Sequence, residues 1–187
     1  RTRRNSLGQA WEQQTRVALN IARDATPDQH TILGSMAPLS DCYRPDLSPD
    51  NPYPAHKEFA DVLVNHGANI LLCETFPHIS EGLKAAEAAL STGAETWLSY
   101  TAGPNADLLS AKAIALGARE AAKMGVSAIL VNCVPAKSAH RYIDAISGHG
   151  IPFGLYANAG HPRDGIGWET GTDGPKKYAE LACRWVD

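Results

Sequence analysis

The sequence predicts an α/β fold in which short buried strands and longer amphipathic helices alternate around one parallel sheet. Short apolar runs recur along the chain, helix-like stretches separate them, and glycine stands at the return from helix to strand. The predicted strands are 31–39, 69–76, 96–102, 127–134 and 152–159. The predicted helices are 11–25, 55–66, 80–91, 108–124, 137–147 and a last one from about residue 175.

Each predicted strand is short and largely apolar on both faces, as in residues 70–72 and 128–131. Parallel strands that are covered on both faces have this composition. In the helix at 55–66, Phe59, Val62 and Leu63 lie three and four positions apart, which places them on one face. We therefore expect the helices to pack an apolar face against a buried sheet.

Four of the predicted helices end in glycine directly before an apolar run, at Gly67, Gly93, Gly125 and Gly150. Glycine just past a helix adopts the left-handed conformation that caps the last carbonyls. These turns imply serial βα units with right-handed crossovers and a parallel sheet. No Gly-x-Gly-x-x-Gly follows any strand, which favours a (β/α)8 barrel over an open, doubly wound dinucleotide-binding sheet.

The composition is that of one globular domain over residues 1–187, with 44% hydrophobic residues, 20% charged residues and a net charge of −3. The chain lacks the basic excess of nucleic-acid-binding domains. It also lacks the ~20-residue apolar run that crosses a bilayer and the apolar stretch of a signal peptide. We expect a cytoplasmic protein without nucleic-acid or membrane partners. Its four cysteines should be reduced, because they show no Cys-x-x-Cys spacing.

Groups that can do chemistry follow all five predicted strands on their C-terminal side. They are Gly34-Ser35-Met36, Cys73-Glu74-Thr75, Ser99-Tyr100-Thr101, Asn132-Cys133 and Tyr156-Ala157-Asn158-Ala159-Gly160. The active site of a (β/α)8 barrel is built at this edge of the strands. The sequence therefore predicts that these groups meet in one site.

Two of these residues give the clearest chemical indications. Glu74 ends an apolar strand, where a carboxylate is costly unless it meets a cation or several donors. It therefore indicates either a site for an ammonium group or a proton, or a structural ion pair with a neighbouring strand. Cys133 follows an apolar strand and is a candidate inert core thiol, nucleophile or metal ligand. Cys73 precedes Glu74 directly, so we expect it on the opposite face of the strand, in the core.

The remaining cysteines and the loop histidine give weaker signals. Cys42 lies in the Pro- and Asp-rich loop 40–51 and Cys183 in the last helix, and neither has metal-ligand spacing. His161 follows the last strand, where it either reaches the mouth of the barrel or lies on the surface.

Three motifs together carry a resemblance to a known family. They are Cys-Glu-Thr-Phe at 73–76, Val-Asn-Cys-Val-Pro at 131–135 and Tyr-Ala-Asn-Ala-Gly at 156–160. In this order the chain resembles the zinc-dependent homocysteine S-methyltransferases, whose fold is a (β/α)8 barrel. Residues 1–7 and 34–38 are similar to family segments too, so the resemblance runs essentially from end to end.

The resemblance implies an enzyme of methionine biosynthesis that transfers a methyl group from an onium-type or folate donor to homocysteine. Zinc would be held by three cysteines, of which Cys133 matches the first, and the homocysteine thiolate would be a further ligand. Zinc favours a thiolate at neutral pH, which makes this chemistry reasonable. Glu74 matches the glutamate that binds the homocysteine amino group. Asn132 and Asn158 match polar positions expected to orient the substrate.

The sequence departs from the family pattern at the other zinc ligands. These are an adjacent Cys-Cys pair in the family, and no such pair occurs here; Cys183, on a helix, is no replacement. By resemblance the chain covers strands three to seven, so the single barrel domain 1–187 is expected to be incomplete at both ends. Poor metal binding and poor turnover by the isolated chain would follow.

Two alternatives remain open at this point. One is a zinc-independent barrel enzyme that uses Cys133 as nucleophile or Glu74 as general base. The other is a non-catalytic barrel segment whose open edges are covered by another chain, for instance in a homo-oligomer. The sequence does not select the methyl donor.

Overall fold

Five parallel strands form one sheet in the order of the chain. The computed structural model describes residues 10–27, 30–159 and 174–186. The strands are β1 (Leu33–Met36), β2 (Ile70–Phe76), β3 (Glu95–Tyr100), β4 (Ala128–Pro135) and β5 (Phe153–Asn158). Each strand pairs in parallel with the next, in the order β1-β2-β3-β4-β5. The predicted α/β fold with a parallel sheet is therefore confirmed.

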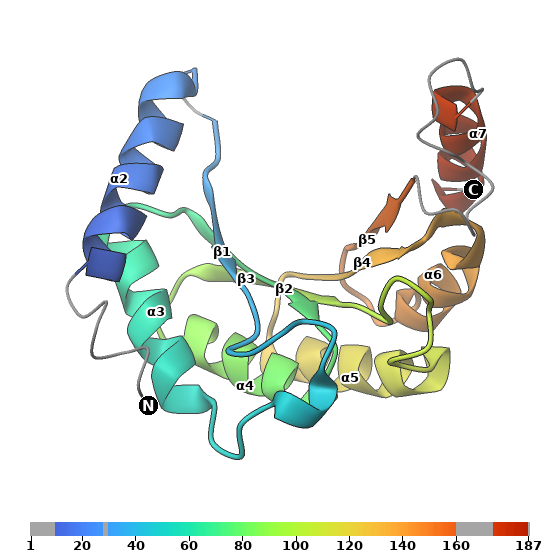
Figure 1. Cartoon of the computed structure of the whole chain (residues 1–187), viewed down its shortest axis with the longest axis horizontal. Coiled ribbons are helices and arrows are strands. Elements are labelled where there is room, and N and C mark those ends of the chain that lie inside the picture. Colours follow the sequence, from blue (N-terminus) through green and yellow to red (C-terminus); the bar gives the residue numbers. More distant parts are fainter. Residues whose placement is uncertain (1–9, 28–29, 160–173, 187) are drawn as a thin grey trace.

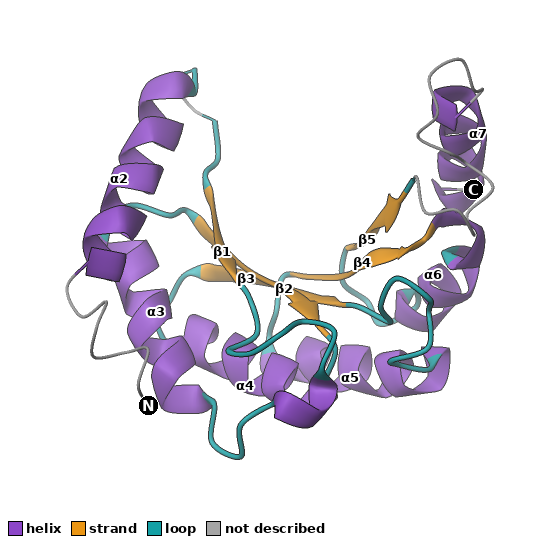
Figure 2. Cartoon of the chain, viewed as in Figure 1, coloured by secondary structure: helices purple, strands orange, loops and turns teal. Residues whose placement is uncertain are grey.

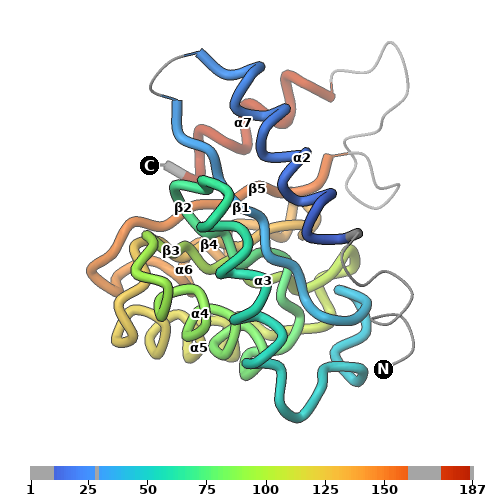
Figure 3. Tube along the Cα trace, turned by 90° about the vertical axis from the view of Figure 1, so that its left-hand side faces the viewer, coloured from blue at the N-terminus to red at the C-terminus, as the bar shows by residue number. Residues whose placement is uncertain are grey.

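The helices follow the outer, convex side of this sheet. They are α2 (Ala10–Ala25), α3 (Tyr53–Asn65), α4 (Ile79–Leu90), α5 (Ala111–Met124), α6 (His140–Ile146) and α7 (Gly174–Val186), with 3-10 turns at Pro45–Leu47 and Ala136–Ser138. Figure 1 shows them as an arc from α2 to α7, and Figure 2 shows the strands inside it. The side view shows α4 and α5 on one side of the sheet (Figure 3).

This arrangement is that of serial βα units wound in one direction. A doubly wound sheet would carry helices on both faces, whereas the concave face carries no helix among the described residues (Figure 1). The five described strands do not close on themselves, because β1 and β5 each have one neighbour. They are consistent with part of a barrel. No helix in the described ranges is long and apolar enough to cross a membrane.

The predicted element bounds differ from the observed ones at helix starts. The helix expected from residue 108 begins at Ala111, because the Ser110 hydroxyl caps it by accepting the Ala113 N–H at 3.1 Å. The helix expected from residue 137 begins at His140, after a 3-10 turn. All four predicted glycines have the left-handed backbone, with φ of 89° at Gly67, 82° at Gly93, 95° at Gly125 and 77° at Gly150. The expected helix end at Gly150 is wrong, because α6 already ends at Ile146 with Ser147 as its C-cap.

The core lies between the sheet and the helices. Leu71, Leu98 and Ile129 on the three central strands are fully buried. Tyr100, at the end of β3, lies between α4 and α5: a Cβ at Gly82 would be 2.8 Å from its ring, and one at Gly117 would be 2.9 Å from its hydroxyl. Glycine at these two positions therefore lets both helices approach the sheet.

The predicted placement of Cys73 in the core gives a first testable result. Its side chain is 0% exposed, and burial raises the pKa of the thiol to about 12. Because alkylation requires an accessible thiolate, we expect iodoacetamide at pH 8 to leave Cys73 unmodified in the native chain and to modify it in urea. Mass spectrometry of the tryptic peptides measures this. Native labelling of Cys73 as fast as that of exposed Cys183 would contradict the structure.

Candidate functional site

The carboxyl ends of the strands bring Glu74 together with two hydroxyl groups. Ser35, on β1, donates a hydrogen bond to Glu74 Oε1, and Tyr156, on β5, donates one to Oε2 at 2.7 Å. In a flat sheet, strands three places apart would lie about 14 Å from each other, too far for this contact. The Tyr156 bond to β2 therefore shows that the sheet is strongly curved and that these side chains lie on its concave side.

Glu74 keeps acceptor capacity for a ligand. An ionised carboxylate has about four lone-pair positions, and the two hydroxyls occupy one on each oxygen. Within the described ranges Glu74 forms no ion pair, so the structural ion pair that the sequence left open is not formed there. The carboxylate is thus oriented by neutral donors and can still accept a cationic group.

Asn132 connects three strand ends. Its Oδ1 accepts hydrogen bonds from the Thr75 N–H at 3.1 Å and the Ser99 hydroxyl at 2.6 Å. Its Nδ2 donates to Thr75 Oγ1 at 2.7 Å and to the Cys133 sulfur at 3.1 Å. All four positions of the buried amide are thereby used within the protein. The geometry supports a role in positioning Cys133 and Thr75, and direct contact of Asn132 with a ligand stays a prediction.

Two residues of the site have a left-handed backbone. Thr75 has φ of 66° and Cys133 has φ of 54°, a conformation that is costly for side chains other than glycine and most costly for β-branched ones. Both lie where the strand register shifts, between Cys73 and Phe76 and between Asn132 and Pro135. Bulges of this kind commonly adjoin active sites, where they redirect side chains. The bonds from Asn132 hold both residues in place.

The electrostatic environment of the site is acidic. Burial is the largest cause that raises the pKa of Tyr156, and the Glu74 hydrogen bond, the Glu74 charge and Cys133 raise it further, against a hydrogen bond with Ser99 that lowers it. Tyr156 therefore remains a neutral donor at physiological pH. The Tyr156 side chain lies close to both Glu74 and Cys133. It therefore connects these two predicted site residues.

The loop between β1 and α3, residues 37–52, adds two residues to the surroundings of Cys133. Tyr43 and the Cys42 thiol both lie near enough to Cys133 to interact with it electrostatically. Burial is the main cause that raises the pKa of both Tyr43 and Cys42. No sequence pattern predicts this contact, because Tyr43 is ninety residues from Cys133 and lies in an irregular loop.

The other predicted residues are placed as follows. Asn158 ends β5 opposite Pro135 of β4, at the same edge as Glu74 and Cys133, and is partly buried. His161 lies outside the described residues. Ser35 and Tyr156 stood among the strand-end groups that the sequence singled out, yet their pairing with Glu74 depends on the curvature of the sheet, which the pattern does not encode.

The residues around Cys133 do not make up a zinc site by themselves. Among the residues that the structure describes, no three His, Cys, Asp or Glu side chains are grouped so that they could hold a metal ion. A structural or catalytic zinc needs at least three protein ligands. Cys133 can supply one sulfur, and the described part of the chain does not complete the set.

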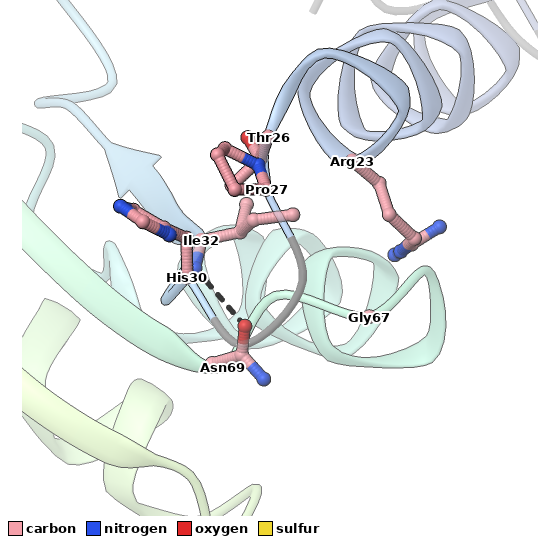
Figure 4. Close-up of a pocket in the computed structure, with 7 residues that line it drawn as sticks. All are labelled: Arg23, Thr26, Pro27, His30, Ile32, Gly67 and Asn69. Atoms are coloured by element: carbon pink, nitrogen blue, oxygen red, sulfur yellow. Dashed lines mark hydrogen bonds between the residues drawn. The ribbon is translucent and has the colours of Figure 1, made fainter.

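A separate pocket lies at the opposite ends of the strands. It has a volume of about 240 Å³ and is lined by Arg23, His30 and Asn69 among others. In Figure 4 the Asn69 side chain accepts a hydrogen bond from the Ile32 N–H at 3.0 Å, just before β1 and β2 begin. Active sites of parallel α/β folds form at the carboxyl ends of the strands, so this pocket is not the candidate site.

The fold and the site together define a parallel α/β protein of the serial βα type, with its reactive side chains gathered on the concave carboxyl edge. The sequence model of the homocysteine S-methyltransferase family matches residues 1–187. The chain belongs to this family.

Two solved structures share the fold. The metallated form of the homocysteine methyltransferase MmuM from Escherichia coli is 18% identical, with a TM-score of 0.50 over 78% of this chain and 62% of that one. The oxidized form is 17% identical, with a TM-score of 0.50 over 82% and 68%. The chain thus spans less than two thirds of the metallated structure. None of the curated proteins matches this chain.

Proposed function

We propose that this chain binds homocysteine at the concave edge of the sheet and takes part in transferring a methyl group to its sulfur, which yields methionine. The observation that carries the proposal is the Glu74 carboxylate, which two hydroxyls orient and which keeps free acceptor positions. Family membership supplies the reaction class. The geometry of the site supports the residue roles proposed below.

Glu74 would bind the amino group of homocysteine. An ammonium group offers three donors, and the two hydroxyls leave about two lone-pair positions of the carboxylate open. Charge-assisted hydrogen bonds of this kind are roughly twice as strong as neutral ones. Ser35 and Tyr156 would act as positioning residues that keep the carboxylate from turning away.

Cys133 would lie beside the sulfur of the bound homocysteine. The Asn132 amide donates a hydrogen bond to its sulfur at 3.1 Å, and the Tyr43 hydroxyl contacts it from the loop. These contacts orient the Cys133 side chain. By resemblance Cys133 would be one zinc ligand, and zinc would then supply the activation of the homocysteine thiol.

The acidic character of the site favours a cationic methyl donor. Its described groups are a carboxylate, thiols and hydroxyls, with no lysine or arginine bonded to them. A sulfonium or quaternary ammonium donor carries a positive charge that such surroundings attract. We therefore propose an onium donor over a folate, which carries carboxylates.

The test is methionine formation by the purified chain from isotopically labelled homocysteine, with S-methylmethionine, adenosylmethionine, betaine or methylfolate supplied separately. We expect slow methionine formation with an onium donor, in keeping with the incomplete zinc ligand set of the described residues. We expect loss of at least about 90% of this rate in Glu74→Gln and Cys133→Ser. Cys183→Ser, on the exposed face of α7, is the matched control and should retain the rate.

The possible outcomes separate the alternatives. Equal rates in the wild-type chain and in Cys133→Ser would overturn the role of Cys133. A rate that persists in the presence of a strong zinc chelator would favour the zinc-independent enzyme. Binding of homocysteine that depends on Glu74 but yields no methionine would show a binding module, and would overturn methyl transfer by this chain.

A further inference from the structure

A buried carboxylate on α4 contacts both ends of the β1–α3 loop. The side chain of Glu81 is 2% exposed. Its Oε1 accepts a hydrogen bond from the Leu39 N–H at 2.9 Å, near the start of the loop. The side chain of Ser48, near the end of the loop, also lies close enough to interact with this carboxylate. One side chain thereby joins two points of the loop that are nine residues apart.

A third residue, His56, packs against Glu81 and completes the cluster around this carboxylate. His56, on α3, is 1% exposed, and its Nε2 lies 3.4 Å from Glu81 Oε1. The imidazole packs edge-on against Phe76, with ring centroids 5.6 Å apart. Phe76 follows Thr75 at the end of β2, so the cluster around Glu81 adjoins the bulge that positions the site.

The burial of this charge is compensated by the contacts of the loop. Removing a carboxylate from water is costly unless hydrogen-bond donors replace the water. Burial acts to raise the pKa of Glu81, but its interactions with His56, Ser48 and the Leu39 N–H outweigh it and hold the pKa below its usual value. Ser48 and Leu39 belong to the loop. The charge therefore stabilises the loop in the position where its donors reach Glu81.

Between its two anchors, the loop is bonded mainly to itself. The Tyr43 N–H donates to Asp41 Oδ1 at 2.8 Å, and the Leu47 N–H donates to the Arg44 carbonyl at 2.9 Å. Arg44 also forms an ion pair with Asp46 at 2.6 Å. These local bonds make the segment move as a unit, so fixing both of its ends fixes its middle.

The middle of the loop is the part that meets Cys133. The Tyr43 side chain lies close enough to Cys133 for the two groups to interact, and Cys42 lies nearby. We propose that Glu81 is a positioning residue: by holding Leu39 and Ser48, it keeps Tyr43 against Cys133 and controls access to that thiol. This inference goes beyond the proposed reaction and does not depend on it, because it concerns the loop and the thiol alone.

The experiment compares amide hydrogen exchange and thiol alkylation in the whole 187-residue chain, with a metal chelator in every sample. Glu81→Gln keeps the size of the side chain but leaves a single acceptor oxygen. We expect exchange in peptides covering 37–52 to become about tenfold faster. Alkylation of Cys133 by iodoacetamide should rise toward the rate in Tyr43→Ala, which uncovers Cys133 directly.

Two internal controls separate positioning from general destabilisation. Glu87→Gln removes an exposed carboxylate from the same helix, where it pairs with Lys84, and should change neither measurement. Cys73, which is fully buried in β2, should stay unlabelled in Glu81→Gln. A structural role alone would expose Cys73 together with Cys133.

Ser48→Ala is the second variant, because it removes only the loop hydroxyl that interacts with Glu81 and leaves α4 unchanged. Faster exchange confined to the loop, with faster labelling of Cys133, supports the proposal in either variant. Unchanged exchange and labelling in both variants would overturn it. If Glu81→Gln also exposes Cys73, the Ser48→Ala variant alone decides. Faster loop exchange and faster Cys133 labelling in Ser48→Ala would then support the proposal, and no change in either would overturn it.

Discussion

Replacing Glu74 with glutamine is expected to weaken the binding of L-homocysteine by roughly tenfold to a hundredfold. The substitution keeps the shape of the side chain and removes the charge that faces the amino group of the substrate. In the wild-type chain the two carboxylate oxygens accept hydrogen bonds from the Ser35 and Tyr156 hydroxyls. The substitution replaces one of these acceptor oxygens with an amide donor. Isothermal titration calorimetry measures the change.

Two further variants make this result specific. Tyr156→Phe removes one of the hydroxyls that orient the carboxylate and should weaken binding less than Glu74→Gln does. Glu87→Gln changes the net charge by the same amount at an exposed site on α4 and should bind like the wild-type chain. Equal affinities in the wild-type chain and in Glu74→Gln would show that the amino group binds elsewhere.

Replacing Asn132 with alanine is expected to lower the free energy of unfolding by about 2–4 kcal/mol. The substitution removes four hydrogen bonds at once and leaves the Thr75 N–H and the Ser99 hydroxyl without their partner. It also releases Thr75 and Cys133, whose left-handed backbone those bonds help to hold. Urea denaturation followed by circular dichroism measures the loss.

The matched control is Asn65→Ala, at an exposed position at the end of α3. Surface substitutions of this kind change stability by no more than about 0.5 kcal/mol. A loss of less than about 1 kcal/mol in Asn132→Ala would contradict the view that this amide holds the strand ends together.

Most of the fold follows from local patterns in the sequence. The apolar runs and the glycine turns identify all five strands because both signals act within a few residues, as at Gly125 before β4. Helix starts are less well predicted, since a capping side chain such as that of Ser110 overrides apolar periodicity. The curvature of the sheet is a property of the assembled strands, and no local pattern specifies it.

The residues of the site, too, are predictable where the signal is local and unpredictable where it depends on long-range contacts. Glu74, Asn132 and Cys133 are predictable because a polar residue at the end of an apolar strand stands out in the sequence. Their partners are less so: the bond between Tyr156 and Glu74 spans 82 residues and crosses the concave face. The contact of Tyr43 with Cys133 depends on a loop that Glu81 holds from another helix. Neither Tyr43 nor Glu81 carries a signal in the sequence that links it to the site.

The most direct test of the central claim is a crystal structure of the chain with L-homocysteine bound. We expect the amino nitrogen of the ligand within hydrogen-bonding distance of the Glu74 carboxylate, and its sulfur beside Cys133. A ligand bound elsewhere, with Glu74 still bonded only to Ser35 and Tyr156, would contradict the assignment of this edge of the sheet as the homocysteine site.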